Sequence, residues 1–170
     1  GLALCRPGAG RTPAPPHLVV PNRFANKMDG ETYGGEAVVT WQVQEWWRLS
    51  ATYSFLSIQL HTDPSSTDTV AESAEGESPR NQFMLRSSMD LPHNIELDAT
   101  LRYVDNLPSI KVHSHLESDV RVGWKPTKHL ELSIVGQNLF DNQHQEFNRG
   151  ARLPFTEVQR SGYFKMTLKF

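Results

Sequence analysis

The sequence predicts an all-β fold, in which about seven strands form an antiparallel up-and-down meander. First, apolar and polar residues alternate through most of the chain from Glu31 onward, which is typical of strands with two different faces. Second, the connections between the alternating segments are short at one end and longer at the other. Third, the last segment keeps an apolar residue at every second position up to Phe170.

The first two strands are expected on either side of a tight connection at Glu45 and Trp46. Odd positions are apolar in both segments: Tyr33, Ala37, Val39, Trp41 and Val43 before the turn, and Trp47, Leu49, Ala51, Tyr53 and Phe55 after it. A long polar loop is expected over residues 62–79. Its acidic residues are Asp63, Asp68, Glu72, Glu75 and Glu77. They could bind a cation, but a solvated loop explains them more simply.

Further strands are expected over residues 80–91, 95–103 and 110–124, and from residue 130 onward. Short turns are expected at 92–94 and 126–128, a medium loop around 106–108 and a second long loop over 142–158. The strand at 110–124 has the apolar face Val112, Leu116, Val120, Val122 and Trp124, and the polar face His113, His115, Glu117, Asp119 and Arg121. The closing strand has the apolar row Phe164, Met166, Leu168 and Phe170.

Loop lengths and aromatic residues together favour a membrane-spanning barrel over a soluble sheet. Such barrels carry short turns on one side of the membrane, longer loops on the other, and a row of aromatics at each interface. The row expected beside the short turns is Trp41, Trp47, Trp124 and Phe170, and the row expected beside the long loops is Phe55, Phe83, Tyr103 and Phe140. The expected fold is therefore the C-terminal segment of a transmembrane β-barrel. A soluble β-sandwich that binds glycans or proteins is the alternative, because its strands alternate in the same way.

Composition sets further limits on the class of protein. The formal net charge is -2, so no nucleic-acid-binding surface is predicted, and the single cysteine, Cys5, excludes an internal disulfide. No run of about 18 apolar residues predicts a membrane helix. Residues 1–21 are rich in Pro and Gly and are expected to be disordered or a loop, whereas 22–170 form the barrel segment. Because no signal peptide is present, we expect the chain to be a fragment of an exported protein.

No catalytic or cofactor-binding motif is present, so the sequence predicts neither an enzyme nor a bound cofactor. One group of possible metal ligands alternates along the strand at 110–124: His113, His115, Glu117 and Asp119. A polar strand face explains these residues more simply, and no metal site is predicted. Charged residues on the polar faces are expected to form a ladder across neighbouring strands; they are Arg86, Glu96, Asp98, Arg102, Glu117, Asp119 and Arg121.

The end of the chain resembles the TonB-dependent outer-membrane receptors. The resemblance is carried by Gly136, Asn138, Leu139, Phe140 and Asp141, followed by a loop and a strand that ends on Phe170. A second similarity is the segment GETYGGE before the first strand. The closing row Phe164, Met166, Leu168 and Phe170 also resembles the signal read by the barrel-assembly machinery, although Gly162 lies further upstream than the usual glycine.

The resemblance implies a barrel of 22 strands in the outer membrane of a Gram-negative bacterium, in contact with lipid and lipopolysaccharide. It implies an N-terminal plug, contact with TonB through that plug, and energised import of a small-molecule ligand such as a ferric siderophore or cobalamin. The plug and the earlier strands are absent from this sequence, so the chain alone is not expected to transport. A passive porin-like barrel would share every strand feature and is the main alternative function.

Overall fold

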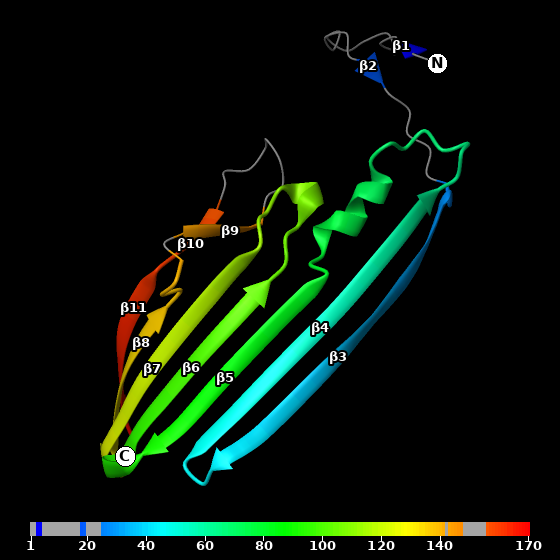
Figure 1. The fold of residues 1–170 in the computed structure, drawn as a ribbon. Coiled ribbons are helices and arrows are strands. Elements are labelled where there is room, and N and C mark those ends of the chain that lie inside the picture. Colours follow the sequence, from blue (N-terminus) through cyan, green and yellow to red (C-terminus); the bar gives the residue numbers. More distant parts are fainter. Residues whose placement is uncertain (1–2, 5–17, 20–24, 142, 148–155) are drawn as a thin grey trace, which may run out of the picture.

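The computed structural model describes residues 3–4, 18–19, 25–141, 143–147 and 156–170. Their main feature is one seven-stranded antiparallel sheet with the strand order β11-β8-β7-β6-β5-β4-β3 (Figure 1). The strands are β3 (Met28–Gln44), β4 (Trp47–Thr62), β5 (Asn81–Leu91), β6 (Ile95–Val104), β7 (His115–Thr127), β8 (Leu130–Gln137) and β11 (Ser161–Leu168). Sequential neighbours pair throughout, which confirms the predicted meander and, with it, the all-β fold of a barrel segment.

Short and long connections lie at opposite ends of the sheet (Figure 1). One end carries the turn at Glu45 and Trp46, the 3-10 turn η2 (Pro92–Asn94) and the turn between β7 and β8. The other end carries η1 (Ala71–Glu77), η3 (Pro108–Ile110) and the two short strands β9 (Gln143–Phe147) and β10 (Thr156–Gln159). The predicted asymmetry of loop lengths is therefore confirmed for the described part of the chain.

The strand registers bring like residues onto the same face of the sheet. Trp47 pairs with Met89, Met89 with Leu97, and Leu97 with Val122. On the opposite face, Arg86 pairs with Thr100 and Asp98 pairs with Arg121. Because directly opposed residues point to the same side, the sheet has one apolar face and one polar face, and we use these two names below.

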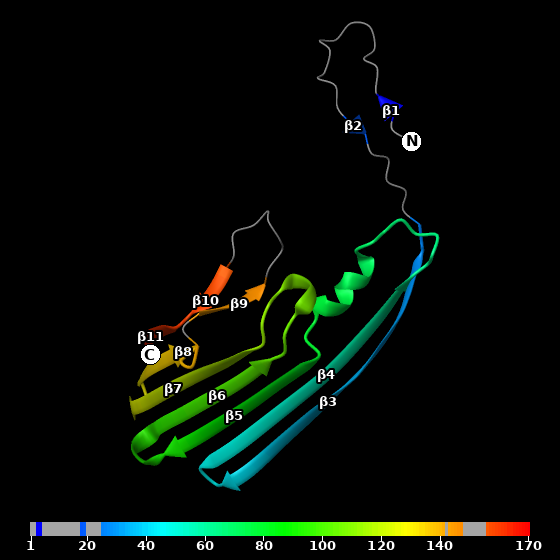
Figure 2. The same cartoon turned by 45° about the horizontal axis from the view of Figure 1, so that its top comes forward.

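The sheet is curved, and β3 and β11 are its two edges (Figures 1 and 2). The seven strands form one sheet and not two packed sheets, so the described residues do not have the architecture of a β-sandwich. No helix among the described residues is long and apolar enough to cross a membrane.

The strand predicted over residues 110–124 begins only at His115. Pro108 opens the η3 turn, and Lys111 then adopts a left-handed backbone with φ 56°, which interrupts the extended chain. Val112 forms an isolated bridge with Leu107 and is 2% exposed. It belongs to a small buried contact in the β6–β7 loop and not to the apolar face, so its predicted position was wrong.

Two predicted loops contain more structure than the sequence indicated. The loop at 62–79 includes η1, and the loop at 142–158 includes the antiparallel pair β9–β10. Most of the Pro- and Gly-rich segment at 1–21 lies outside the described residues. Within it, β1 (Ala3–Leu4) pairs with β2 (Leu18–Val19). The turn predicted at 126–128 lies slightly later, since β7 continues to Thr127.

Candidate functional site

The apolar face of the sheet is open to its surroundings. Its outward-pointing side chains include Val39, Trp41, Ile134 and Phe164, each between 61% and 65% exposed. None of the described residues at these alternating positions between Trp41 and Tyr33, or between Trp47 and Phe55, is charged. An exposed apolar surface of this extent marks a site of contact with a partner or a membrane.

The aromatics near the short turns form a row that crosses the strands obliquely. Trp41 pairs with Leu49, so Trp47 lies two residues nearer the short turns than Trp41 does. Trp47 pairs with Met89, which pairs with Leu97, so Trp47 and Leu97 lie at the same level of the sheet. Trp124 pairs with Ile95 and therefore lies two residues nearer the short turns than Leu97 does.

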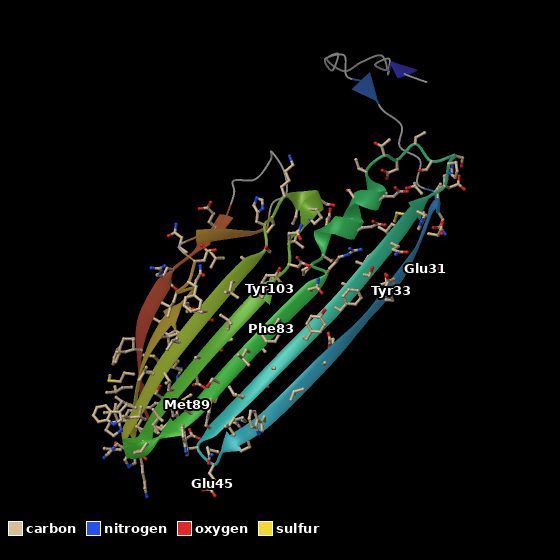
Figure 3. All side chains as sticks on the ribbon, in the orientation of Figure 1. Glu31, Tyr33, Glu45, Phe83, Met89 and Tyr103 are labelled. Carbon is tan, nitrogen blue, oxygen red and sulfur yellow. The ribbon has the colours of Figure 1, made fainter. Side chains whose placement is uncertain are left out.

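The aromatics toward the long loops form a second row that slopes in the same direction. Tyr33 pairs with Ser57, and Phe55 lies two residues nearer the short turns. Phe55 pairs with Asn81 on β5. Phe83 lies two residues nearer the short turns than Asn81 and pairs with Tyr103 on β6. Figure 3 shows Tyr33, Phe83 and Tyr103 in the half of the sheet toward the long loops. Tyr33 and Phe55 also touch, with ring centroids 6.2 Å apart.

The slope of the two rows can be compared with the tilt of strands in a barrel. With a rise of about 3.3 Å per residue and a strand spacing of about 4.8 Å, both rows cross the strands at roughly 35–45° from the perpendicular. Strands in membrane barrels are tilted from the membrane normal by about the same angle, 35–45°. Two aromatic rows that are oblique to the strands would therefore lie parallel to the membrane plane.

The rows are also separated by a suitable distance. Trp41 and Tyr33 lie eight residues apart on β3, which is about 26 Å along the strand and, at such a tilt, about 20 Å along the membrane normal. The apolar band of an outer-membrane barrel is about 25 Å tall. The strand registers align Trp41, Trp47 and Trp124 in one row and Phe55, Phe83 and Tyr103 in the other, which Tyr33 extends; Phe140 and Phe170 lie beyond the paired strands. That these aromatics lie at the membrane interfaces stays a prediction.

Beyond the second row, the polarity of β4 is reversed. From Trp47 to Phe55, odd positions are apolar and point to the apolar face. After Phe55, the side chains on the apolar face are polar: Ser57, Gln59 and His61. Those on the opposite face are apolar: Leu56, Ile58 and Leu60. On the neighbouring strand β3, Glu31 lies on the apolar face two residues beyond Tyr33 in the direction of the long loops (Figure 3). This reversal was not predicted, although it is visible in the sequence as a change of phase at Phe55–Leu56.

Two acidic residues of the predicted polar loop cap the end of β4. The strand β5 begins opposite Phe55, so the later residues of β4 have no strand on that side. There, a carboxylate oxygen of Glu72 accepts hydrogen bonds from the backbone N–H and the hydroxyl of Thr62, at 2.8 and 2.7 Å. Glu75 accepts a hydrogen bond from the N–H of Leu60. The hydroxyl of Thr62, and then its N–H, hold the pKa of Glu72 below the ordinary glutamate value.

The residues that carry the family resemblance lie where the chain leaves β8. Asn138 has a left-handed backbone with φ 53°, which Asn tolerates better than most residues, and is 3% exposed. Its N–H donates to Asp119 at 3.0 Å and its Nδ2 donates to the carbonyl of Val158 at 3.3 Å. A Cβ at Gly136 would lie 3.0 Å from a methyl group of Leu139. The motif therefore joins β7 to the strand β10, while Phe140 is 70% exposed and Asp141 ends the segment.

The polar face carries the predicted charge ladder, and Arg121 is at its centre. Arg121 donates hydrogen bonds to Glu96, Asp98 and Glu131, each at 3.0 Å, from two different neighbouring strands. Lys125 also donates to Glu96. A second group nearer the long loops joins Arg102 to Glu117 at 2.7 Å and Glu117 to His115 at 3.3 Å.

The four possible metal ligands do not form one group, although His115 and Glu117 are in contact. His113 precedes β7, so it does not share the strand face with His115, Glu117 and Asp119 as predicted. Among the described residues, no group of three or more His, Cys, Asp or Glu side chains is placed to hold a metal ion.

The closing strand β11 lies at an edge and exposes its apolar row. Phe164, Met166 and Leu168 are 62%, 58% and 53% exposed. Pairing with the β7–β8 turn continues beyond the strand, because the N–H of Lys169 donates to the carbonyl of His129 at 2.9 Å. Phe170 follows at the short-turn end and is fully exposed. Its predicted role in assembly is not tested by this arrangement.

Comparison with known proteins supports the fold. A chain from the solved structure of the FpvAI–pyocin S2 complex, a complex of a TonB-dependent receptor, superposes with a TM-score of 0.64 at 18% sequence identity. The match covers 84% of this chain and 20% of that chain, so this chain spans about a fifth of the matched protein. No family model matches the sequence, and no curated protein matches it. At this level of identity the likeness shows the fold alone.

Proposed function

We propose that this chain is part of an outer-membrane β-barrel receptor, with the apolar face in contact with lipid and the polar face lining the interior. The observation that carries the proposal is the pair of parallel aromatic rows, Trp41–Trp47–Trp124 and Tyr33–Phe55–Phe83–Tyr103, around an uncharged surface. The reversal of polarity on β4 supports it, because a strand that leaves the lipid no longer needs an apolar outer face. The long loops then lie outside the cell and the short turns in the periplasm.

Within this function, we propose energised uptake of a scarce nutrient such as a ferric siderophore or cobalamin. The support is the resemblance at Gly136–Asp141 and the fold shared with a chain of the FpvAI complex. This chain corresponds to about a fifth of the matched FpvAI-complex chain. The plug and the contact with TonB would belong to the parts of the full-length protein that correspond to the remainder. A passive porin-like barrel would use the same strands but would need neither.

Deletion of Phe170 in the full-length protein tests the barrel itself. Phe170 continues the apolar row of β11, a strand that must pair on its open side to leave no edge in lipid. We expect the deletion to reduce the amount of membrane protein whose mobility on gels changes on heating, and to leave the ligand affinity of assembled protein nearly unchanged. Normal amounts of inserted protein would contradict the assembly role.

Uptake assays separate transport from passive diffusion. Cells that express the full-length protein would be given radiolabelled ferric siderophores and cobalamin, with TonB present or inactivated. We expect saturable uptake of one of them that is lost without TonB. Uptake that does not depend on TonB would indicate a porin-like barrel instead.

A further inference from the structure

The polar face has a hollow at the short-turn half of β3, β4 and β5 that none of the features above explains. Its cavity volume is about 350 Å³. It is lined by two arginines and three hydroxyl residues, which are Thr40, Arg48, Ser50, Arg86 and Ser88.

The strand registers place these groups around one point. Ser50 pairs with Thr40 on one side and with Arg86 on the other, and the hydroxyls of Ser50 and Thr40 are hydrogen-bonded at 3.2 Å. Arg48 pairs with Ser88, so the two arginines are diagonal neighbours, a spacing of about 7–8 Å between backbones. Side chains as long as arginine reach a common point across this spacing.

The arginines of the hollow have fewer acidic partners than Arg121, because Arg86 shares Asp98 with Arg121 and no ion pair of Arg48 is found among the described residues. A guanidinium nitrogen of Arg86 lies 3.7 Å from Asp98, and the side chain of Arg86 is 57% exposed. Asp98 is bound more closely by Arg121, at 3.0 Å. Arg48 is exposed and forms no ion pair within the part of the chain that the structure describes. Asp90, on the same face of β5, lies diagonally opposite Arg48 and is not paired with it there.

We propose that this hollow is a binding site for an oxyanion, either a carboxylate or a phosphate group. Two guanidinium groups supply planar pairs of N–H donors that match such oxygens. The Thr40–Ser50 pair keeps one hydroxyl hydrogen free to donate, whereas the hydroxyl of Ser88 donates to Asp98 at 2.8 Å. The inference rests on the proposed function in that it places the polar face inside a barrel. The anion is a free small molecule in the interior or an acidic side chain of a polypeptide that fills the interior.

A cysteine at the centre of the hollow reports on this site whichever anion binds there. The variant is Ser50→Cys in the full-length protein with Cys5 and every other cysteine replaced by serine, purified in detergent and checked for heat-modifiable mobility. Two thiol reagents of similar size are compared, a methanethiosulfonate that carries a sulfonate and one that carries a trimethylammonium group. We expect the anionic reagent to react about tenfold faster, because a cleft with one sign of charge concentrates the opposite ion.

Matched variants identify the source of that preference. Arg48→Gln with Arg86→Gln should reduce the ratio of the two rates to near one, whereas Lys165→Gln, which removes a positive charge from the same face on β11, should leave it unchanged. Asp90→Asn should raise the ratio. Millimolar inorganic phosphate or citrate should slow the anionic reagent when both arginines are present.

Each result has a defined meaning. A preference for the anionic reagent that depends on Arg48 and Arg86 supports a site for free anions. A cysteine that is slow with both reagents, and that becomes fast only in Arg48→Gln, supports a bound polypeptide carboxylate. A reactive cysteine without preference, or a slow one that Arg48→Gln does not change, would overturn the site. Protein without heat-modifiable mobility would instead count against the proposed barrel.

Discussion

The two halves of β4 have the same backbone conformation but opposite side-chain patterns. From Trp47 to Phe55 the apolar residues lie on the apolar face of the sheet, and from Leu56 to Leu60 they lie on the other face. Ile58 in the second half is half-buried and lines a hollow together with Glu72 and Glu75 of η1, which also bind the backbone of β4. The alternation of a strand therefore reflects what surrounds it: in our proposal, lipid outside the first half and water outside the second.

The largest expected effect comes from a charge on the outer side of the first half. Ala51→Arg should lower the free energy of unfolding in phospholipid vesicles by about 2–4 kcal/mol, as a charge in the middle of the membrane does. Gln59→Arg lies on the same face of the same strand but beyond Phe55, and should change it by less than about 0.5 kcal/mol. A denaturant titration followed by tryptophan fluorescence measures both.

A neighbouring position controls for the introduction of an arginine as such. Thr52 is next to Ala51 but points to the polar face. Thr52→Arg should therefore cost much less than Ala51→Arg. If Ala51→Arg, Thr52→Arg and Gln59→Arg cost the same, the two halves of β4 do not differ in their surroundings.

A smaller effect is expected from the inner side of the second half. Ile58→Ala should lower the free energy of unfolding by about 1 kcal/mol, less than for a fully buried residue because Ile58 is only half-buried. It should also increase proteolytic cleavage in residues 62–79. Gln59→Ala, one position away on the open side, is the matched control, and equal effects of the two would contradict the reversal.

The alternation of apolar and polar residues predicted the strands, their order and the face on which Trp41, Trp47 and Trp124 lie. It could do so because each face of a strand has the same surroundings along most of its length. It did not predict the burial of Val112, since that depends on the bridge to Leu107 across a turn. The role of Glu72 was also beyond reach, because it becomes visible only when η1 is placed against β4. Similarly, the charges of Arg121 and Arg48 look alike in sequence, and only the strand register shows that one has three acidic partners.

The smallest expected effect is the pH dependence of the contact between η1 and β4. The pKa of Glu72 is lowered in the folded protein by the Thr62 hydroxyl and N–H, so the contact is stabilising above the ordinary glutamate pKa of about 4.3 and is lost as the pH falls through the lower folded value. Hydrogen exchange of the Thr62 amide, corrected for its intrinsic rate, should therefore accelerate in acid. Glu72→Gln should make exchange fast at neutral pH as well, and Glu77→Gln should not. Slow exchange in Glu72→Gln would mean that the carboxylate does not hold the strand.

Spin labels placed singly along β4 of the full-length protein in lipid vesicles test the membrane boundary most directly. Their accessibility to oxygen, which concentrates in lipid, is compared with their accessibility to a water-soluble nickel complex. The proposed barrel predicts high oxygen and low nickel accessibility at Leu49, Ala51 and Tyr53, and the reverse at the exposed residues Gln59 and His61. The same balance of oxygen and nickel at both sets of positions would contradict a membrane boundary at Phe55.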